Sequence, residues 1–307
     1  MRLYIKRPVI QGAWQWIQRG YKLAWEAAGF DAVYYDNLEE IKDAEFDLMV
    51  REWDIKTPGD LETLSRATRA YLFAQATTFP LPWGSHPNFR SSSAPELREL
   101  INKMPNVYLW SFGETFEYHE GWKKVHSLQL AFDTVSYKQV FDPRYTYDIC
   151  YIGGRANNGF DEKYKIMLKY FGQFRHSKRK VGVFIGKNLS HEQENLILCS
   201  SKVCLNIHDS YQKTLVMTDT NERTFKSLGC NGALVSDREG FIPKHFPDVP
   251  IADTPEEMVE LTEKYLTMPP KELKDIKEGH KEQISRNHTY LARTQEALAF
   301  KNFEENK

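Results

Sequence analysis

The residues from 218 to 240, TDTNERTFKSLGCNGALVSDREG, constrain the fold of the chain more than any other stretch. Helix-capping residue types lead up to Asn221 and apolar residues then recur one turn apart, which predicts a helix starting there. Gly229 and the Asn-Gly pair behind it end this helix. The apolar run 233–235, followed by Asp237, is typical of a buried parallel strand whose carboxyl end borders a ligand. The stretch therefore predicts an α/β protein with a site at this junction.

The composition describes a soluble globular chain. Its 307 residues, 41% of them hydrophobic, are enough for two domains with separate cores. No run of about 18 uncharged apolar residues occurs, and residues 1–7 are too charged for a secretory signal, so we expect a cytoplasmic protein. The net charge of −1 excludes a globally basic nucleic-acid binder but leaves local basic patches open.

The cysteines show no spacing that suits a metal site. Each lies in or beside an expected strand or helix, so reduced, buried thiols are expected rather than a disulfide or a zinc site. These residues are Cys150, Cys199, Cys204 and Cys230.

The first half of the chain alternates between strand and helix patterns. An expected strand at 2–5 precedes an apolar helix face from 14 to 28, and strands follow at 32–36 and 46–50. This order indicates a right-handed parallel unit of the doubly wound type. The loops after its strands, among them 11–14, would line one crevice.

A polar linker leads to a second half of the same plan, which predicts domains at 1–143 and 144–307. This half opens with a strand that runs into Gly153, Gly154 and Arg155. Paired glycines let a backbone approach a phosphate, and an arginine grips it through two hydrogen bonds. The same turn equally suits a plain strand-to-helix connection.

Further cations follow in the second half. The basic run 175–180, RHSKRK, is either a solvated loop or a phosphate-backbone contact. Lys187 follows an expected strand and could reach a phosphate, whereas His208 ends the next strand as a crevice residue or a turn residue. Arg223 lies at a helix start, where free amides already favour an anion.

Three blocks of the second half resemble the CgeB-like, group-1-related glycosyltransferases: SSKVCLNIH at 200–208, NERTFKSLGCNGALVSDREG at 221–240 and NHTYLAR at 287–293. The resemblance covers residues 147–300. It implies the GT-B architecture, with two doubly wound, Rossmann-like α/β domains facing each other across a cleft. It also implies a transferase that takes a sugar from a nucleoside diphosphate donor held mainly by the second domain.

The resemblance assigns donor-binding roles by position. Arg155 and Arg223 would hold the diphosphate, and Asn221 and Thr224 would frame the donor. With the crevice residues, the expected donor site comprises Gly153, Gly154, Arg155, Lys187, His208, Asn221, Glu222, Arg223, Thr224 and Asp237.

One residue departs from the family. Lys226 stands where related retaining enzymes carry the glutamate that holds the nucleotide ribose. Glu222 lies one turn earlier on the same helical face, so it either takes over the ribose or forms an exposed ion pair with Lys226.

The implied reaction needs positive charge on the protein that stabilises the leaving diphosphate. An inverting enzyme also needs a base in the first domain. Fixed cations supply the charge and no convincing Asp-x-Asp motif occurs, so we expect no metal and no cofactor besides the sugar nucleotide. Glu114 is the first candidate for the base, followed by Asp54 and His119, although each also suits a structural role.

The acceptor is expected against Gln11, Gly12 and Trp14, where Trp14 either stacks on the acceptor or packs in the core. The sequence thus predicts a nucleotide-sugar glycosyltransferase acting on a saccharide, a lipid-linked glycan or a small molecule. A DNA-base or protein glycosyltransferase and a non-catalytic nucleotide-sugar-binding protein stay open as competing hypotheses.

Overall fold

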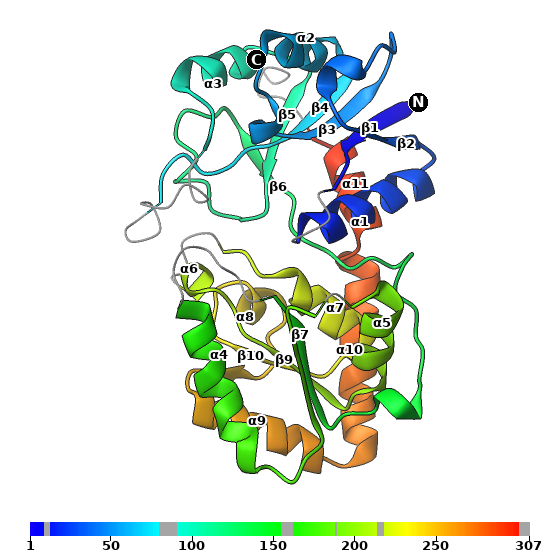
Figure 1. Cartoon of the computed structure of the whole chain (residues 1–307), viewed down its shortest axis with the longest axis vertical. Helices are drawn as coiled ribbons and strands as arrows, with labels where there is room; N and C mark the ends of the chain where they lie inside the picture. The colour runs from blue at the N-terminus through cyan, green and yellow to red at the C-terminus, as the bar shows by residue number, and fades with distance from the viewer. Residues whose placement is uncertain (9–12, 80–90, 155–161, 188, 214–217, 301–307) are drawn as a thin grey trace. The chain divides into compact units, whose positions relative to one another are not determined.

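The protein forms two compact units (Figure 1). Unit 1 comprises Met1–Gln129 and Tyr290–Lys307, and unit 2 comprises Leu130–Thr289. The computed structural model describes residues 1–8, 13–79, 91–154, 162–187, 189–213 and 218–300.

Unit 1 is built on a six-stranded parallel sheet in the order β2-β1-β3-β4-β5-β6. Its buried strands supply an aliphatic core that includes Leu48, Leu72 and Leu109, as expected for a sheet that helices cover. The strands are β1 (Arg2–Lys6), β2 (Asp31–Tyr35), β3 (Asp47–Arg51), β4 (Arg69–Phe73), β5 (Val107–Ser111) and β6 (Val125–Ser127), and the helices are α1 (Trp14–Ala27), α2 (Pro58–Arg66), α3 (Pro95–Asn102) and α11 (Tyr290–Leu298).

Unit 2 is built on a five-stranded parallel sheet in the order β11-β10-β9-β7-β8. Its core includes Tyr151, Met167 and Leu205. The strands are β7 (Ile149–Gly153), β8 (Val181–Ile185), β9 (Val203–Asn206), β10 (Leu234–Asp237) and β11 (Ile251–Ala252), and the helices are α4 (Glu162–Gln173), α5 (His191–Ser200), α6 (Ser210–Lys213), α7 (Glu222–Cys230), α8 (Ile242–His245), α9 (Pro255–Thr267) and α10 (Pro270–Asn287).

The helix and strand predicted within residues 218–240 are confirmed as α7 and β10. The Asn221 side chain caps α7 by accepting a hydrogen bond from the backbone N–H of Thr224. Gly232 follows the helix with a φ of 86°, and an added Cβ there would lie 2.3 Å from the carbonyl oxygen of Lys277. Only glycine combines this backbone conformation with this close approach.

The chain divides differently from the expected boundary between residues 143 and 144. Residues 130–143 belong to unit 2, where the Tyr137 hydroxyl donates to Glu194 and the Gln139 side chain donates to the carbonyl of Gly229. The terminal residues were expected in the second domain, but α11 belongs to unit 1 because it packs on α1. Gly20 makes room for the Tyr290 ring, since a Cβ there would lie 2.4 Å from it.

All four cysteines are free thiols: Cys150, Cys204 and Cys230 are buried and Cys199 is half-buried. Within the described residues, no helix has the length and apolar character that crossing a membrane requires.

Each sheet reverses its strand order at one point. In unit 2 the reversal lies beside β7, because β8 and β9 flank it on opposite sides, and in unit 1 it lies between β1 and β3. Ligands of doubly wound sheets bind outside the carboxyl ends of the strands at such points. The fold therefore directs attention to the residues that follow β7 and β9 in unit 2 and β1 and β3 in unit 1.

Candidate functional site

Arg223 lies at the carboxyl ends of β7 and β9. Its Nε donates to the Ile152 carbonyl at 2.6 Å, and its Nη1 donates to Asn206 Oδ1 at 2.8 Å and to the Ile207 carbonyl at 3.2 Å. The guanidinium carbon is also 4.5 Å from the centroid of the Tyr151 ring, within the range of a cation–π contact. These contacts fix the plane of the guanidinium.

The second terminal nitrogen of Arg223 points toward the glycine turn after β7. A Cβ built on Gly153 would lie 2.2 Å from Nη2, whereas one built on Gly154 would meet no described residue within 4 Å. Within the described residues, the hydrogen bonds of Arg223 use Nε and Nη1 and leave Nη2 without an acceptor. A fixed guanidinium edge beside a turn without side chains is suited to binding an anion.

Replacing Gly153 with alanine is expected to weaken nucleoside diphosphate binding by about tenfold, because the new methyl group displaces the guanidinium from its anion-binding geometry. Gly154→Ala is the matched control, since its methyl group meets none of the described residues within 4 Å. Calorimetric titration of both variants checks the prediction. Equal affinities for the two would contradict the role assigned to the Arg223 edge.

A buried network of hydrogen bonds around Asn206 holds Arg223 in place. Asn206 Oδ1, which holds Nη1, also accepts from Asn221 Nδ2 at 3.0 Å, and Asn206 Nδ2 donates to Thr224 Oγ1 at 2.8 Å. Thr224 Oγ1 lies 2.7 Å from Thr220 Oγ1. Asn221 and Thr224 thus fix Asn206, and through it Arg223, by contacts in addition to the helix cap.

His208 and Asp237 lie deeper in the same network and are fully buried. Asp237 accepts from the His208 backbone N–H at 3.0 Å, lies 2.7 Å from His208 Nδ1 and pairs with Lys213 Nζ at 2.5 Å. Burial opposes ionisation, but the hydrogen bond with His208 and the charge of Lys213 hold the pKa of Asp237 below its ordinary value. The contacts between His208 and Asp237 therefore hold the carboxyl ends of β9 and β10 together inside unit 2.

Two further lysines belong to this edge of the sheet. Lys163, at the start of α4, is buried and pairs with Asp209 at 2.9 Å. Lys187 is exposed just after β8, and the neighbouring Gly186 N–H donates to the Gly153 carbonyl at 3.0 Å. Lys187 thus emerges next to the glycine turn, and its contact with a phosphate stays a prediction. Arg155 lies outside the described residues.

The prediction that Glu222 and Lys226 form an exposed ion pair is wrong, because both side chains lie in buried surroundings. Both side chains are almost buried, and Lys226 lies closer to Glu194, at 2.8 Å, than to Glu222, at 3.8 Å. The side chains of Lys226 and Glu194 are 9% and 7% exposed, and the Tyr137 hydroxyl donates to the other Glu194 oxygen. Lys226 therefore takes part in a buried ion pair with Glu194 of α5.

Burial raises the pKa of Glu222 to about 7, although the nearby Lys226 opposes the shift. The folded protein thus retains a proton that the unfolded chain releases near pH 4.5, so the free energy of unfolding falls as the pH rises from 4.5 to 7. Between pH 5 and pH 7 this fall amounts to about 2 kcal/mol, which Glu222→Gln is expected to remove. Urea unfolding at pH 5 and pH 7 measures it, with the exposed Glu272→Gln as control. An unchanged pH dependence in Glu222→Gln would contradict a neutral Glu222.

The three candidate bases of unit 1 differ in their surroundings. Asp54 forms a bidentate ion pair with Arg51, with two contacts of 2.8 Å. His119 is buried, and burial lowers its pKa to about 4, so it is neutral at physiological pH and shielded from a substrate. Glu114 is half-buried and accepts from Gln129 Nε2 at 2.7 Å. Glu114 is thus the candidate whose surroundings best suit a base.

Trp14 belongs to an aromatic cluster at the carboxyl edge of the unit 1 sheet. Its ring centroid lies 5.5 Å from Trp53, 5.1 Å from Phe73 and 5.5 Å from Phe112, and Arg51 lies over both tryptophans. Trp14, Trp53 and Phe112 are half-buried, so they pack together and still present ring surface. Gln11 and Gly12 lie outside the described residues.

The sequence analysis did not identify most residues of this aromatic cluster, nor several residues around Arg223. The missed residues of unit 1 lie at or just after the ends of neighbouring strands, and this position could have indicated them. Those of unit 2 required knowing which strands are adjacent. The missed residues are Arg51, Trp53, Phe73, Phe112, Tyr151, Asn206 and Lys213.

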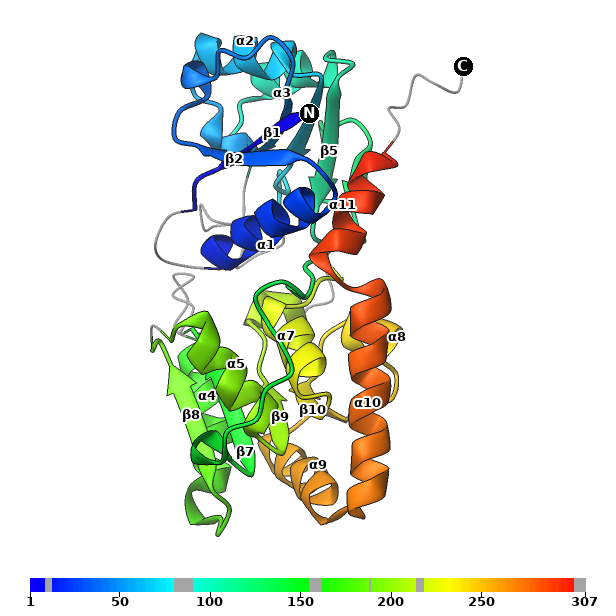
Figure 2. The same ribbon diagram turned by 90° about the vertical axis from the view of Figure 1, so that its right-hand side faces the viewer.

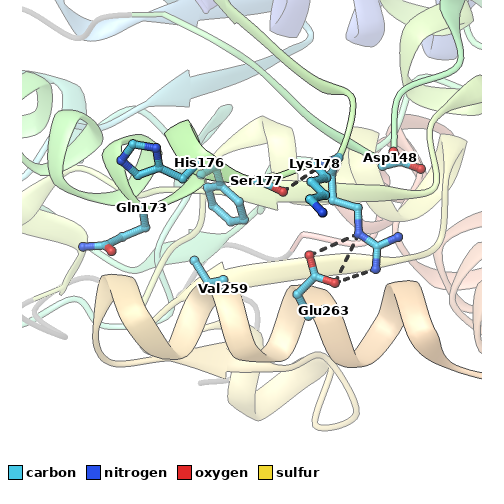
Figure 3. A pocket seen from close by; sticks show the side chains of 9 residues that line it. Asp148, Gln173, His176, Ser177, Lys178, Val259 and Glu263 are labelled. Carbon is cyan, nitrogen blue, oxygen red and sulfur yellow. Dashed lines mark hydrogen bonds and ion pairs between the residues drawn. The ribbon is translucent and has the colours of Figure 1, made fainter.

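A hollow of about 640 Å³ lies at the other end of the unit 2 sheet, before β7 and β8 (Figure 3). Asp148, His176, Lys178 and Glu263 are among its lining residues, and Glu263 is engaged by Arg179 at 2.6 Å. It is separated from Arg223 by the length of the strands, so it does not belong to the candidate donor site. Within the described residues, no group of three His, Cys, Asp or Glu side chains is placed to hold a metal ion.

Comparison with known proteins agrees with this geometry. Residues 155–299, just under half of the 307-residue chain, match a family described as glycosyl transferase-like. No curated protein matches the sequence.

Solved structures align over nearly the whole chain. The DNA modifying enzyme beta-glucosyltransferase, solved in the presence and absence of uridine diphosphoglucose, has a TM-score of 0.59 at 11% identity, covering 97% of this chain and 98% of that one. T4 phage BGT in complex with UDP and Mn2+ has a TM-score of 0.56 at 11% identity, with the same coverage. A UDP-forming α,α-trehalose-phosphate synthase from Burkholderia vietnamiensis has a TM-score of 0.51 at 10% identity, covering 92% and 76%.

These likenesses define the class. The chain has the two-domain, Rossmann-like GT-B fold. Together with the family match in its second half, the fold supports an enzyme of the glycosyltransferase class.

Proposed function

We propose that this protein transfers a sugar from a nucleoside diphosphate donor bound by unit 2. The observation that carries the proposal is the Arg223 guanidinium, fixed by three hydrogen bonds with one edge directed at the glycine turn after β7. That turn adjoins the strand-order reversal of a doubly wound sheet, where nucleotides bind. The CgeB-like assignment within the class is part of the proposal and rests on the blocks at 200–208, 221–240 and 287–293.

The charges at this edge match the chemistry of sugar transfer. The bond between the anomeric carbon and a diphosphate oxygen breaks, so negative charge grows on the leaving diphosphate as the sugar becomes oxocarbenium-like. Arg223 Nη2, the exposed Lys187 and the first amides of α7 would stabilise that charge. We propose that these groups suffice without a metal, in which case a chelator leaves the transfer rate unchanged.

The acceptor would bind to unit 1 beside Trp14 and Trp53, which flank its strand-order reversal. Aromatic faces of this kind pack against the apolar face of a sugar ring, so a saccharide, free or lipid-linked, is the acceptor class we favour. If the reaction inverts configuration, Glu114 would take the proton of the acceptor hydroxyl. A cytoplasmic location is part of the proposal, because unpaired cysteines suit a reducing compartment.

A DNA base is the second candidate acceptor, favoured by the structural likeness to an enzyme described as DNA modifying. It requires DNA binding that weakens steeply with salt. Transfer to a protein acceptor is a third candidate, and a binding protein without turnover is the fourth. A binding protein would hold the donor and release no nucleoside diphosphate with any acceptor.

A thermal-shift panel of nucleoside diphosphates and their sugars tests the donor site. A ligand present at about 100 times its dissociation constant stabilises the folded protein by roughly 2.7 kcal/mol, so one nucleotide family should raise the melting temperature selectively. The absence of a shift with every nucleotide would refute the proposed donor site.

A further inference from the structure

Unit 2 contains a long segment without any acidic residue. Residues 163–191 include eight lysines and arginines but no aspartate or glutamate, in a chain whose net charge is −1. This segment forms α4, the basic run 175–180 and β8, which is the edge strand of the sheet (Figure 2). Its charge is therefore concentrated along one side of unit 2.

Among the residues that the structure describes, most of these cations have no acidic partner. Lys163 pairs with Asp209, and Arg179 pairs with Glu263. Within the described part of the chain, no ion pair involves the other six, which are Lys165, Lys169, Arg175, Lys178, Lys180 and Lys187. A cluster of exposed, unneutralised cations attracts a polyanion.

Apolar side chains are exposed on the same side. On α4, Leu168 is 55% exposed and Tyr164 is 39% exposed, and Val183 on β8 is 37% exposed. Gln173 of α4 donates to Glu256 of α9. Because successive helix residues are about 100° apart, Tyr164 and Leu168 lie on the flank of α4 that faces away from α9.

Val183 of β8 lies on the same side of unit 2 as this flank of α4. It lies two residues from both Val181 and Ile185, which pack against the same core as Met167 and Tyr170 of α4, so its side chain leaves the sheet on the face that α4 covers. By the same helical spacing, Lys165 lies next to Leu168 on the outward face of α4, whereas Lys169 lies on the side of that face toward α9. The exposed acids of α9, Glu256 and Glu260, border the opposite flank.

We propose that this surface, formed by the outer flank of α4, residues 175–180 and β8, binds the surface of a membrane that contains anionic lipids. Lysines would contact lipid headgroups while Leu168, Tyr164 and Val183 enter the interface, the combination that anchors peripheral proteins. A nucleic acid would satisfy the cations but would leave the aliphatic side chains of Leu168 and Val183 in water, so the membrane is the better match. The acids of α9 would face away from the bilayer. This inference is independent of the proposed donor site.

Vesicle flotation with the full chain tests the proposal. Binding is expected to vesicles of phosphatidylcholine mixed with phosphatidylserine and not to phosphatidylcholine alone. Lys165→Gln/Lys169→Gln should weaken binding about 30-fold, since each lysine near an anionic surface contributes roughly fivefold. Leu168→Gln should weaken it about tenfold.

The matched control is Lys271→Gln/Lys274→Gln, which removes two exposed lysines of α10 and should leave binding unchanged. Equal binding to both vesicle types, or an equal loss in the control, would overturn the proposal. Binding to duplex DNA without vesicle binding, reduced by the α4 lysine substitutions and unaffected by Leu168→Gln, would overturn it in favour of a nucleic-acid partner.

Discussion

Replacing Arg223 with alanine is expected to weaken the binding of a nucleoside diphosphate by about 100-fold, because the diphosphate then loses the charge-assisted contact of Nη2. Arg223→Lys should bind with intermediate affinity, since an ammonium keeps the charge but lacks the planar edge. Calorimetric titration of the wild type and both variants with the nucleotide that shifts the melting temperature measures the effect.

Arg223 also holds two backbone carbonyls, so the melting temperature of each free variant must be measured alongside its affinity. Arg238→Ala serves as the matched control, because Arg238 is an exposed arginine paired with Asp253 in the same unit. An unchanged affinity in Arg223→Ala would remove Arg223 from the donor site.

Lys226→Met is expected to lower the free energy of unfolding by about 4 kcal/mol at pH 7, because it leaves the buried Glu194 carboxylate without its cation. Burial alone would raise the pKa of Glu194, but Lys226 and Tyr137 hold it below the ordinary value. Without Lys226 the carboxyl accepts a proton more readily, so the destabilisation should shrink as the pH falls toward 4. Urea unfolding as a function of pH measures both effects.

The double variant Glu194→Gln/Lys226→Met is the control for this ion pair. Removing both charges should restore most of the lost stability, since no buried charge is then left unpaired. A double variant as unstable as Lys226→Met would contradict the ion pair as the cause. Donor binding that survives in the double variant would show that Lys226 does not hold the ribose.

The predictions that succeeded concern short segments whose signals are local. α7 and β10 follow from a capping asparagine, an apolar face of one helical turn and a glycine stop, all within residues 218–240. The parallel, doubly wound plan of both units follows from the alternation of such segments. Each of these signals acts over a few residues, so the linear sequence contains it.

What the sequence did not reveal depends on contacts between distant residues. Lys226 suits an exposed pair with Glu222 by spacing alone, but its closer partner, Glu194, lies 32 residues away on α5. Arg223 owes its fixed geometry to Ile152, 71 residues away. The division of the chain failed for the same reason, because Gly20 and Tyr290 meet only in the folded unit. Spacing along the chain cannot identify such partners.

The candidate site was predicted in part. Gly153, Asn221, Arg223 and Thr224 do converge at one edge of the sheet, because each follows or starts an element that ends there. Tyr151 and Asn206, which hold the guanidinium, are strand residues that carry no motif.

The most direct test of the account is the release of nucleoside diphosphate from the donor that unit 2 binds, measured with and without a panel of saccharide acceptors. We predict slow release from the donor alone, acceleration by an acceptor and loss of both in Arg223→Ala. Tight donor binding without release, whatever acceptor is added, would contradict a transferase and would identify a nucleotide-sugar-binding protein.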